Sequence, residues 1–131
     1  MPRTLHIGLV CSSEQNADRF YGDLLGLTRQ ERKTIPVSIV KPLFGLEAPL
    51  AALNYIGAGL HVELFLIDGH PGNNDRLTHN CLEVEDLKQL LERAASLECT
   101  VTRIPRGDGW IVFLDDFDGN RFEIKEHPTG I

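Results

Sequence analysis

Two histidines and two glutamates recur in the same order along the 131-residue chain. His6 precedes Glu63 in the first half, and His79 precedes Glu123 in the second. Both glutamates lie in one short pattern: a glycine, two variable residues, an apolar residue, the glutamate and an aliphatic residue. Neutral imidazoles and carboxylates together suit borderline or fairly hard divalent metals. The order therefore predicts a duplicated chain in which each half supplies one imidazole and one carboxylate to a metal site.

The segments around these four residues alternate as strands do. Val62 and Leu64 flank Glu63, and Phe122 and Ile124 flank Glu123. Because successive side chains leave a strand on opposite faces, the aliphatic residues share one face and the candidate ligand takes the other. If helices cover the aliphatic faces, all four candidate ligands fall on the opposite, concave face of the sheet.

The other elements follow from local signals. An apolar helical stripe from residue 17 to 25 predicts a first helix, with Ser12 as its N-cap and Gly26 at its end, and a similar stripe predicts a second helix near 86–97. Further strands are expected at 28–35, 50–56, 60–67, 99–104, 110–114 and 120–125. Residues 41–49, which contain two prolines and a glycine, are expected to form a loop.

Each half is thus expected to consist of a strand, a helix and then three strands. This predicts an α+β protein of two βαβββ modules, which form a curved mixed sheet around a cleft with the helices on its convex face. We expect a single domain over 1–131, with module 1 at 1–68, a turn-rich linker at 69–77 and module 2 at 78–127. An irregular tail is expected from residue 127 to 130.

Charge and composition narrow the classes of partner. A formal charge of −6 argues against nucleic acid and against an anionic membrane surface. No apolar run approaches the roughly 20 residues of a membrane span, and the amino terminus lacks a signal peptide's apolar region, so a cytoplasmic location is expected. Cys11, Cys81 and Cys99 have no Cys-x-x-Cys spacing and are expected to be reduced and mostly buried.

Several motifs together resemble the vicinal oxygen chelate superfamily. In chain order they are His6-Ile7-Gly8-Leu9-Val10, Phe20-Tyr21-x-x-Leu24-Leu25-Gly26-Leu27, Val62-Glu63-Leu64, His79 with Val84-Glu85-Asp86-Leu87, and Phe113-Leu114-Asp115-Asp116-Phe117-Asp118-Gly119-Asn120-Arg121-Phe122-Glu123. The family includes glyoxalase I, methylmalonyl-CoA epimerase, extradiol dioxygenases, fosfomycin-resistance enzymes and metal-free bleomycin-binding proteins. The resemblance covers nearly the whole chain and implies the two-module fold and a homodimer.

In glyoxalase-like members, the positions that match His6, Glu63, His79 and Glu123 bind one divalent metal. The dioxygenase and fosfomycin-resistance branches typically use two histidines and one glutamate, so Glu63 favours the glyoxalase or epimerase side, although the epimerase usually has an amide there. The resemblance therefore implies one zinc, nickel, cobalt, manganese or ferrous ion. It also implies a lyase or isomerase acting on a small, vicinally oxygenated substrate, with Glu63 or Glu123 as the base.

Other functions remain open at this point. A ferrous-iron ring-cleaving dioxygenase and a metal-free drug- or ligand-binding protein are the alternatives. His61 shares a strand face with Glu63 and competes with it as the ligand from that strand. Taken alone, a histidine at a strand start such as His6 or His79 is more often a hydrogen-bonded structural residue.

Four further residues are candidates for substrate binding, each with a plainer interpretation. Phe65 shares the Glu63 face, whereas Trp110 lines the pocket or merely packs. Cys81 lies in the His79 strand and is more often a buried, inert thiol. Arg121 shares the face of Glu123 and suits an anionic group, yet charges near a strand end are more often solvated. The acidic run at 115–118 is expected to be a turn rather than a calcium loop.

Overall fold

The computed structural model describes residues 1–128 and divides into two compact units, Met1–Gly72 and a second that begins at Asn73. Residues 129–131, which the predicted domain and tail include, lie outside the described residues. The division falls within the turn-rich segment predicted as a linker. Each unit contains a mixed β-sheet and at least one helix, so the predicted α+β class is confirmed.

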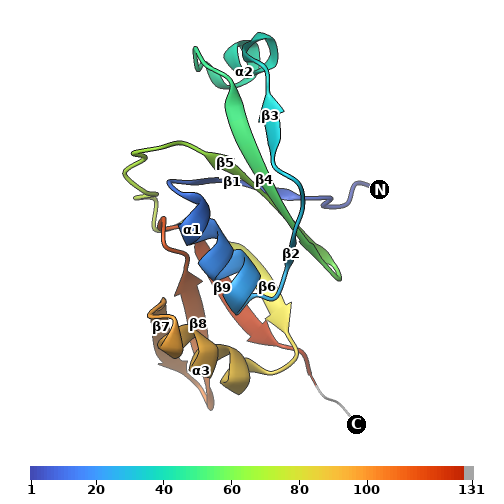
Figure 1. Cartoon of the computed structure of the whole chain (residues 1–131). Coiled ribbons are helices and arrows are strands. Elements are labelled where there is room, and N and C mark those ends of the chain that lie inside the picture. Colours follow the sequence, from blue (N-terminus) through green and yellow to red (C-terminus); the bar gives the residue numbers. More distant parts are fainter. Residues whose placement is uncertain (129–131) are drawn as a thin grey trace. The chain divides into compact units, whose positions relative to one another are not determined.

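Unit 1 is built on a sheet of five strands (Figure 1). They are β1 (Ile7–Cys11), β2 (Thr28–Arg29), β3 (Lys33–Ile35), β4 (Leu50–Gly57) and β5 (Leu60–Leu66). The order is β1-β5-β4-β2, with β3 also paired to β4, and only β1 and β5 run parallel. The predicted β4–β5 hairpin is confirmed, and the single strand expected over 28–35 is divided into β2 and β3.

The helix of unit 1 covers the aliphatic face of this sheet. Helix α1 (Glu14–Ala17) continues as the π-helical segment η1 (Asp18–Leu24). The rings of Tyr21 and Tyr55 lie 5.8 Å apart, and Val62 and Leu64 are fully buried on the same sheet face as Tyr55. Burying these side chains stabilises the unit and leaves Glu63 on the other face.

The N-cap of the first helix is Ser13, so the prediction of Ser12 was wrong by one residue. The backbone N–H of Asn16 donates to Ser13 Oγ at 3.0 Å. Because the first helical residue is Glu14, the residue before the first turn is Ser13. Ser12 Oγ instead accepts from the side-chain amide of Asn16 at 3.2 Å.

The loop expected over 41–49 is also partly wrong, because helix α2 (Val37–Phe44) enters this range. The helix lies at the end of β3 and β4 (Figure 1). It contains Pro42, which normally breaks a helix. Two features outweigh that signal: Val40 is fully buried, and Gly45 ends the helix with a left-handed φ of 73°.

Unit 2 repeats the plan with four strands. They are β6 (Asn80–Val84), β7 (Thr100–Arg106), β8 (Gly109–Asp115) and β9 (Arg121–Glu126), in the order β6-β9-β8-β7. Only β6 and β9 run parallel. Helix α3 (Leu87–Ser96) contacts β7 and β9 and begins at the predicted position, where the N-cap Asp86 accepts from the backbone of Gln89 at 3.0 Å.

The two units are equivalent in the way that matters for the predicted site. In each, the strand that follows the histidine runs parallel to the strand that carries the glutamate. Gly8 lies beside Glu63 in one unit, and Cys81 lies beside Glu123 in the other. This equivalence confirms two βαβββ modules; the cleft that they would share remains a prediction. Over residues 1–128, every helix is too short or too polar to cross a bilayer.

Candidate metal centre

In unit 1, the structure brings His6 and Glu63 together. His6 precedes β1 and lies two residues before Gly8, which is the neighbour of Glu63 in the parallel ladder. Both side chains therefore leave the sheet on the same face. His6 Nε2 lies 3.6 Å from Glu63 Oε1, and the side chains are 49% and 24% exposed. Both side chains therefore remain partly exposed to solvent.

In unit 2, His79 and Glu123 form the equivalent pair. His79 Nε2 lies 3.5 Å from Glu123 Oε1, with side chains 35% and 22% exposed. The ring of Phe113, the ladder neighbour of Glu123 on β8, lies 4.9 Å from the His79 ring. The two pairs thus have nearly the same spacing although they come from different units.

One hydrogen bond determines which nitrogen of His79 is available. His79 Nδ1 lies 2.7 Å from the carbonyl oxygen of Leu77. Because a carbonyl oxygen can only accept, Nδ1 must carry the proton and donate it. In the neutral ring, Nε2 then bears the lone pair and faces Glu123. A hydrogen bond of this kind orients metal-binding histidines in general.

These observations test whether a divalent metal suits the residues present. The neutral Nε2 of His79 and the carboxylate of Glu123 are both acceptors, and a cation would satisfy both. Two ligands at about 2.1 Å from one ion in tetrahedral geometry lie about 3.4 Å apart, close to both observed spacings. Over residues 1–128, no three or more His, Cys, Asp or Glu side chains form a group able to hold a metal. The observed clusters are therefore pairs, and the four-ligand site remains a prediction.

His61, the alternative ligand from β5, makes a hydrogen bond of its own. Its Nε2 lies 2.6 Å from Oδ1 of Asn54, so that nitrogen donates to the amide oxygen. Its ring lies 5.4 Å from the ring of His6. Glu63, not His61, is the acid that faces His6 Nε2. The geometry therefore favours Glu63 as the ligand from β5.

Two further residues on this face, Asn54 and Phe44, were not predicted from the sequence. Asn54 is buried and pairs directly with Glu63 across β4 and β5. Its signal was available, because it is the single amide in an otherwise apolar strand. Phe44 lies in the segment expected to be a loop, and its ring is 5.3 Å from that of Phe65. Phe65 itself lies on the Glu63 face, where strand alternation places it.

Cys81 is exposed, so the expectation of a buried thiol was wrong for this residue. It lies on β6, an edge strand, with its side chain on the same face as Glu123. Partial burial, together with the negative charge of Glu123, raises the pKa of the thiol. A raised pKa leaves less of the reactive thiolate at neutral pH. Cys11 is buried and Cys99 is partly buried, as expected.

Arg121 is not solvated, contrary to the plainer expectation for a charge near a strand end. Its side chain is 15% exposed, and Nε lies 3.1 Å from Asp115 Oδ1. Its guanidinium also stacks over Phe113 at 4.6 Å and donates to the carbonyl of Arg76 at 3.0 Å. Much of its hydrogen-bonding capacity is therefore already used within unit 2. Its role in substrate binding remains a prediction.

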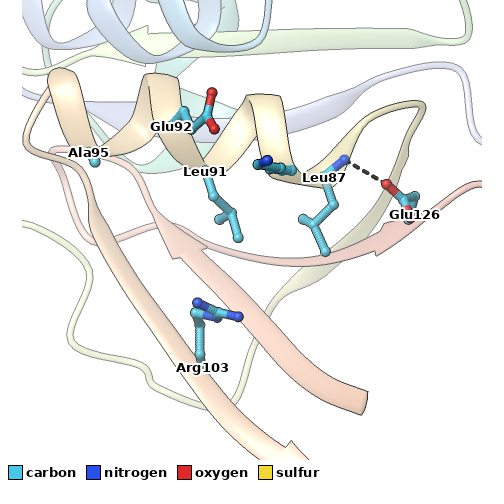
Figure 2. A pocket seen from close by; sticks show the side chains of 7 residues that line it. Leu87, Leu91, Glu92, Ala95, Arg103 and Glu126 are labelled. Atoms are coloured by element: carbon cyan, nitrogen blue, oxygen red, sulfur yellow. Dashed lines mark hydrogen bonds between the residues drawn. The ribbon is translucent and has the colours of Figure 1, made fainter. Parts of the chain in front are cut away.

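Trp110 lies on the helix side of its sheet, because it alternates with Ile111 and Phe113 along β8. The guanidinium of Arg103 stacks on it at 4.7 Å. A hollow of about 500 Å³ lies on this side, between α3 and β7, with Leu87 and Leu91 pointing into it (Figure 2). The backbone N–H of Leu87 donates to Glu126 at 2.9 Å at its edge.

A second hollow, of about 620 Å³, has Trp110 and Glu123 in its lining. It opens where β8 and β9 part, beyond the last ladder pair of Val112 and Ile124. The structure thus leaves Trp110 a candidate for substrate binding at the edge of the sheet. It does not place the indole on the sheet face of Glu123.

The acidic run before β9 is a turn, as expected. Asp116 Oδ1 accepts from the backbone N–H groups of Asp118 at 2.9 Å and Asn120 at 2.8 Å, and Oδ2 accepts from the Asn120 amide at 2.9 Å. The carboxylate thus binds the turn itself. The turn positions the start of the strand that carries Glu123.

With the two pairs located, comparison with known proteins identifies the class. The chain belongs to the Glyoxalase/Bleomycin resistance protein/Dioxygenase superfamily, whose family model matches residues 3–124. This confirms the resemblance to the vicinal oxygen chelate superfamily. No curated protein matches the sequence significantly.

Solved structures agree with this class at the level of the fold. The genomically encoded fosfomycin resistance protein FosX from Listeria monocytogenes has a TM-score of 0.71 at 15% identity, covering 98% of this chain and 96% of that one. The trypanothione-dependent glyoxalase I of Leishmania major has a TM-score of 0.66 at 20% identity, covering 96% and 87%. A glyoxalase family protein from Enterococcus faecalis has a TM-score of 0.67 at 18% identity, covering 93% and 95%.

Proposed function

We propose that the protein is a glyoxalase-like metalloenzyme, a lyase or isomerase that transfers a proton on a small substrate with two neighbouring oxygens. One divalent metal would be held by His6, Glu63, His79 and Glu123. The observation that carries the proposal is the repeated pair, in which a histidine Nε2 faces a glutamate Oε1 at 3.6 Å in unit 1 and 3.5 Å in unit 2.

The residues of the chain have distinct tasks in this proposal. When bound, the metal supplies a Lewis acid that stabilises negative charge developing on a substrate oxygen. Glu63 or Glu123 accepts the proton from the carbon beside the carbonyl and returns it to the neighbouring carbon, so no net proton is gained or lost. The hydrogen bond from His79 Nδ1 to the Leu77 carbonyl holds that imidazole in the tautomer that the site needs.

The relatives are consistent with this assignment. The E126Q mutant of FosX from Listeria monocytogenes has been crystallised with Mn(II) and 1S,2S-dihydroxypropylphosphonic acid, a ligand with two neighbouring oxygens. We further propose a cytoplasmic homodimer acting on a small molecule. Four candidate ligands favour this function over the metal-free binding protein, and the second glutamate favours it over the ring-cleaving dioxygenase with ferrous iron.

Metal content tests the proposal directly. We expect about one equivalent of divalent metal per chain in the purified wild-type protein, and a loss of most of it in His6→Ala and Glu123→Gln. Both variants should also lose isomerisation of the hemithioacetal of methylglyoxal by a factor of about 100 or more, because each removes a metal ligand and Glu123→Gln also removes a candidate base. Elemental analysis and an absorbance assay measure the two quantities.

The chain offers a matched control in a third histidine–glutamate pair. His127 Nδ1 lies 3.0 Å from Glu83 Oε1 on the exposed surface of unit 2. His127→Ala and Glu83→Gln should keep the metal and the activity. A His6→Ala protein that is folded and retains its full metal content would refute the four-ligand site. Oxygen-dependent turnover of a catechol would instead support the dioxygenase.

A further inference from the structure

The sheet face that carries the His6–Glu63 pair changes from polar to aromatic along β5. Phe65 follows Glu63 by two residues, so both side chains project on the same face. The Phe65 ring crosses to the neighbouring strand, since a Cβ placed on Gly8 would meet Phe65 Cε2 at 3.6 Å. Gly8 lies beside Glu63 and two residues after His6. An aromatic ring is therefore the immediate neighbour of the candidate metal ligands in unit 1.

Helix α2 adds a second ring to this surface. The Phe44 ring lies 5.3 Å from the Phe65 ring, and Phe44 remains 48% exposed. Val40, one turn earlier, is fully buried and anchors the helix. Leu43, the residue before Phe44, is more exposed, at 68%. Burial of Val40 thus keeps Phe44 in place against Phe65.

The surroundings of Phe65 are apolar as well. Its ladder partners on the two neighbouring strands are Val10 and Ala52. On its other side, Ala52 pairs with Lys33 of β3. Lys33 is exposed, and as a ladder partner in the same row its side chain lies on the same sheet face as Phe65. This half of the face therefore offers apolar contacts, with a positive charge only at its periphery along that row.

Most of the cationic side chains between η1 and β4 already form ion pairs with glutamates. Arg29 and Arg32 both bind Glu14, at 3.0 Å and 2.7 Å. Lys41, on α2, lies 3.3 Å from Glu47. An anionic substituent placed over Phe65 would thus meet few free charges, whereas an apolar one would meet two rings.

We propose that Phe65 and Phe44 form an apolar subsite, and that the substrate carries an aryl or branched-alkyl substituent next to its two chelating oxygens. The inference rests on the proposed function, which places the metal at the His6–Glu63 pair. Same-face residues in a strand are about 6.6 Å apart, so a substituent one or two bonds from the chelating oxygens reaches Phe65. The subsite selects the substrate by its substituent, while the metal ligands carry the chemistry.

Two hydroxamic acids test the substituent separately from the reaction. Acetohydroxamate and benzohydroxamate present the same pair of neighbouring oxygens to a metal and differ in a methyl against a phenyl group. We expect manganese-loaded wild-type protein to bind benzohydroxamate about tenfold more tightly, as titration calorimetry would measure, because the phenyl ring leaves water against Phe65 and Phe44.

Three variants test whether the preference for the phenyl group comes from Phe44 and Phe65. Phe44→Ala, at a half-exposed position, and Phe65→Leu should each reduce the preference to about threefold or less while acetohydroxamate binds as before. Leu43→Ala, at a more exposed position of the same helix, should leave the preference unchanged. Metal content is measured on every sample.

The outcomes separate this inference from the proposed function. If the wild-type protein binds manganese but shows no phenyl preference, or if the preference survives in both phenylalanine variants, the apolar subsite is refuted and the metal site stands. If the wild-type protein binds none of zinc, nickel, cobalt, manganese and ferrous iron, the proposed function fails and the subsite fails with it.

Discussion

At the residue scale, the candidate site depends on small hydrogen bonds that set the state of a side chain. The Leu77 carbonyl makes His79 Nδ1 the donor, so Nε2 faces Glu123 without a proton in the neutral ring. Asn54 Oδ1 lies 2.6 Å from His61 Nε2, so that nitrogen carries the proton and donates it. Neither the Leu77 carbonyl nor the Asn54 amide is reactive, but each determines which ring nitrogen of its histidine carries a proton.

Asp116 is the residue on which the turn before β9 depends. It is 7% exposed, and its carboxylate accepts three hydrogen bonds from Asp118 and Asn120. We expect Asp116→Ala to lower the free energy of unfolding by about 2–4 kcal/mol, because buried donors lose a charged acceptor. Urea unfolding followed by circular dichroism measures the change.

A surface aspartate provides the control for this prediction. Asp23 is exposed at the end of η1, and Asp23→Ala should change the free energy of unfolding by less than about 0.5 kcal/mol. An Asp116→Ala protein as stable as the control would show that the turn does not need its carboxylate.

At the element scale, a parallel pair of strands brings each histidine beside its glutamate, and turns determine where those strands begin. Gly119 precedes β9 with a φ of 82°, and a Cβ there would lie 2.6 Å from the backbone oxygen of Asn73. Asn73 in turn donates its N–H to the Asp118 carbonyl at 2.8 Å. The turn therefore holds the segment that opens unit 2.

We expect Gly119→Ala to destabilise the protein by about 2–4 kcal/mol, through the left-handed φ and the clash with backbone atoms. Gly22, in the helical segment η1, has open space where the Cβ of an alanine would lie, with nothing within 4 Å. Gly22→Ala should instead stabilise by up to about 1 kcal/mol. Thermal unfolding of both variants checks the opposite signs, and equal effects would contradict the argument.

At the scale of the whole molecule, the duplicated plan gives each unit one histidine and one glutamate of the proposed metal-binding set. The family model spans 122 of the 131 residues, counted from 3 to 124, so both modules belong to the same superfamily domain. Within the described residues, each unit supplies one imidazole facing a carboxylate at the candidate centre. A metal that binds both pairs would therefore link the stability of the two units.

Metal removal tests this linkage. With free metal at about 100 times its dissociation constant, we expect chelation to lower the free energy of unfolding by about 2.7 kcal/mol. His6→Ala and His79→Ala should show little response to chelation, whereas His127→Ala should respond as the wild type does. Denaturant titrations with and without a chelator measure the difference, and a response retained in His6→Ala would contradict a site that uses both pairs.

The sequence by itself determined the duplicated βαβββ plan, the candidate ligands and the faces on which they lie. These follow from local regularities: strand alternation around Glu63 and Glu123, helical stripes, and turn residues between them. Such signals need only neighbouring residues, so the structure confirms the plan, and it also places each histidine beside its glutamate.

Only the tertiary structure decided the features that depend on residues distant in the chain. Burial of Val40 outweighed Pro42 and made α2 a helix, which in turn brought Phe44 to Phe65. Long-range pairing likewise put Asn54 beside His61, and an edge strand left Cys81 exposed. The physical reason is that packing energy depends on which distant segments come into contact, and the local sequence pattern does not specify those contacts.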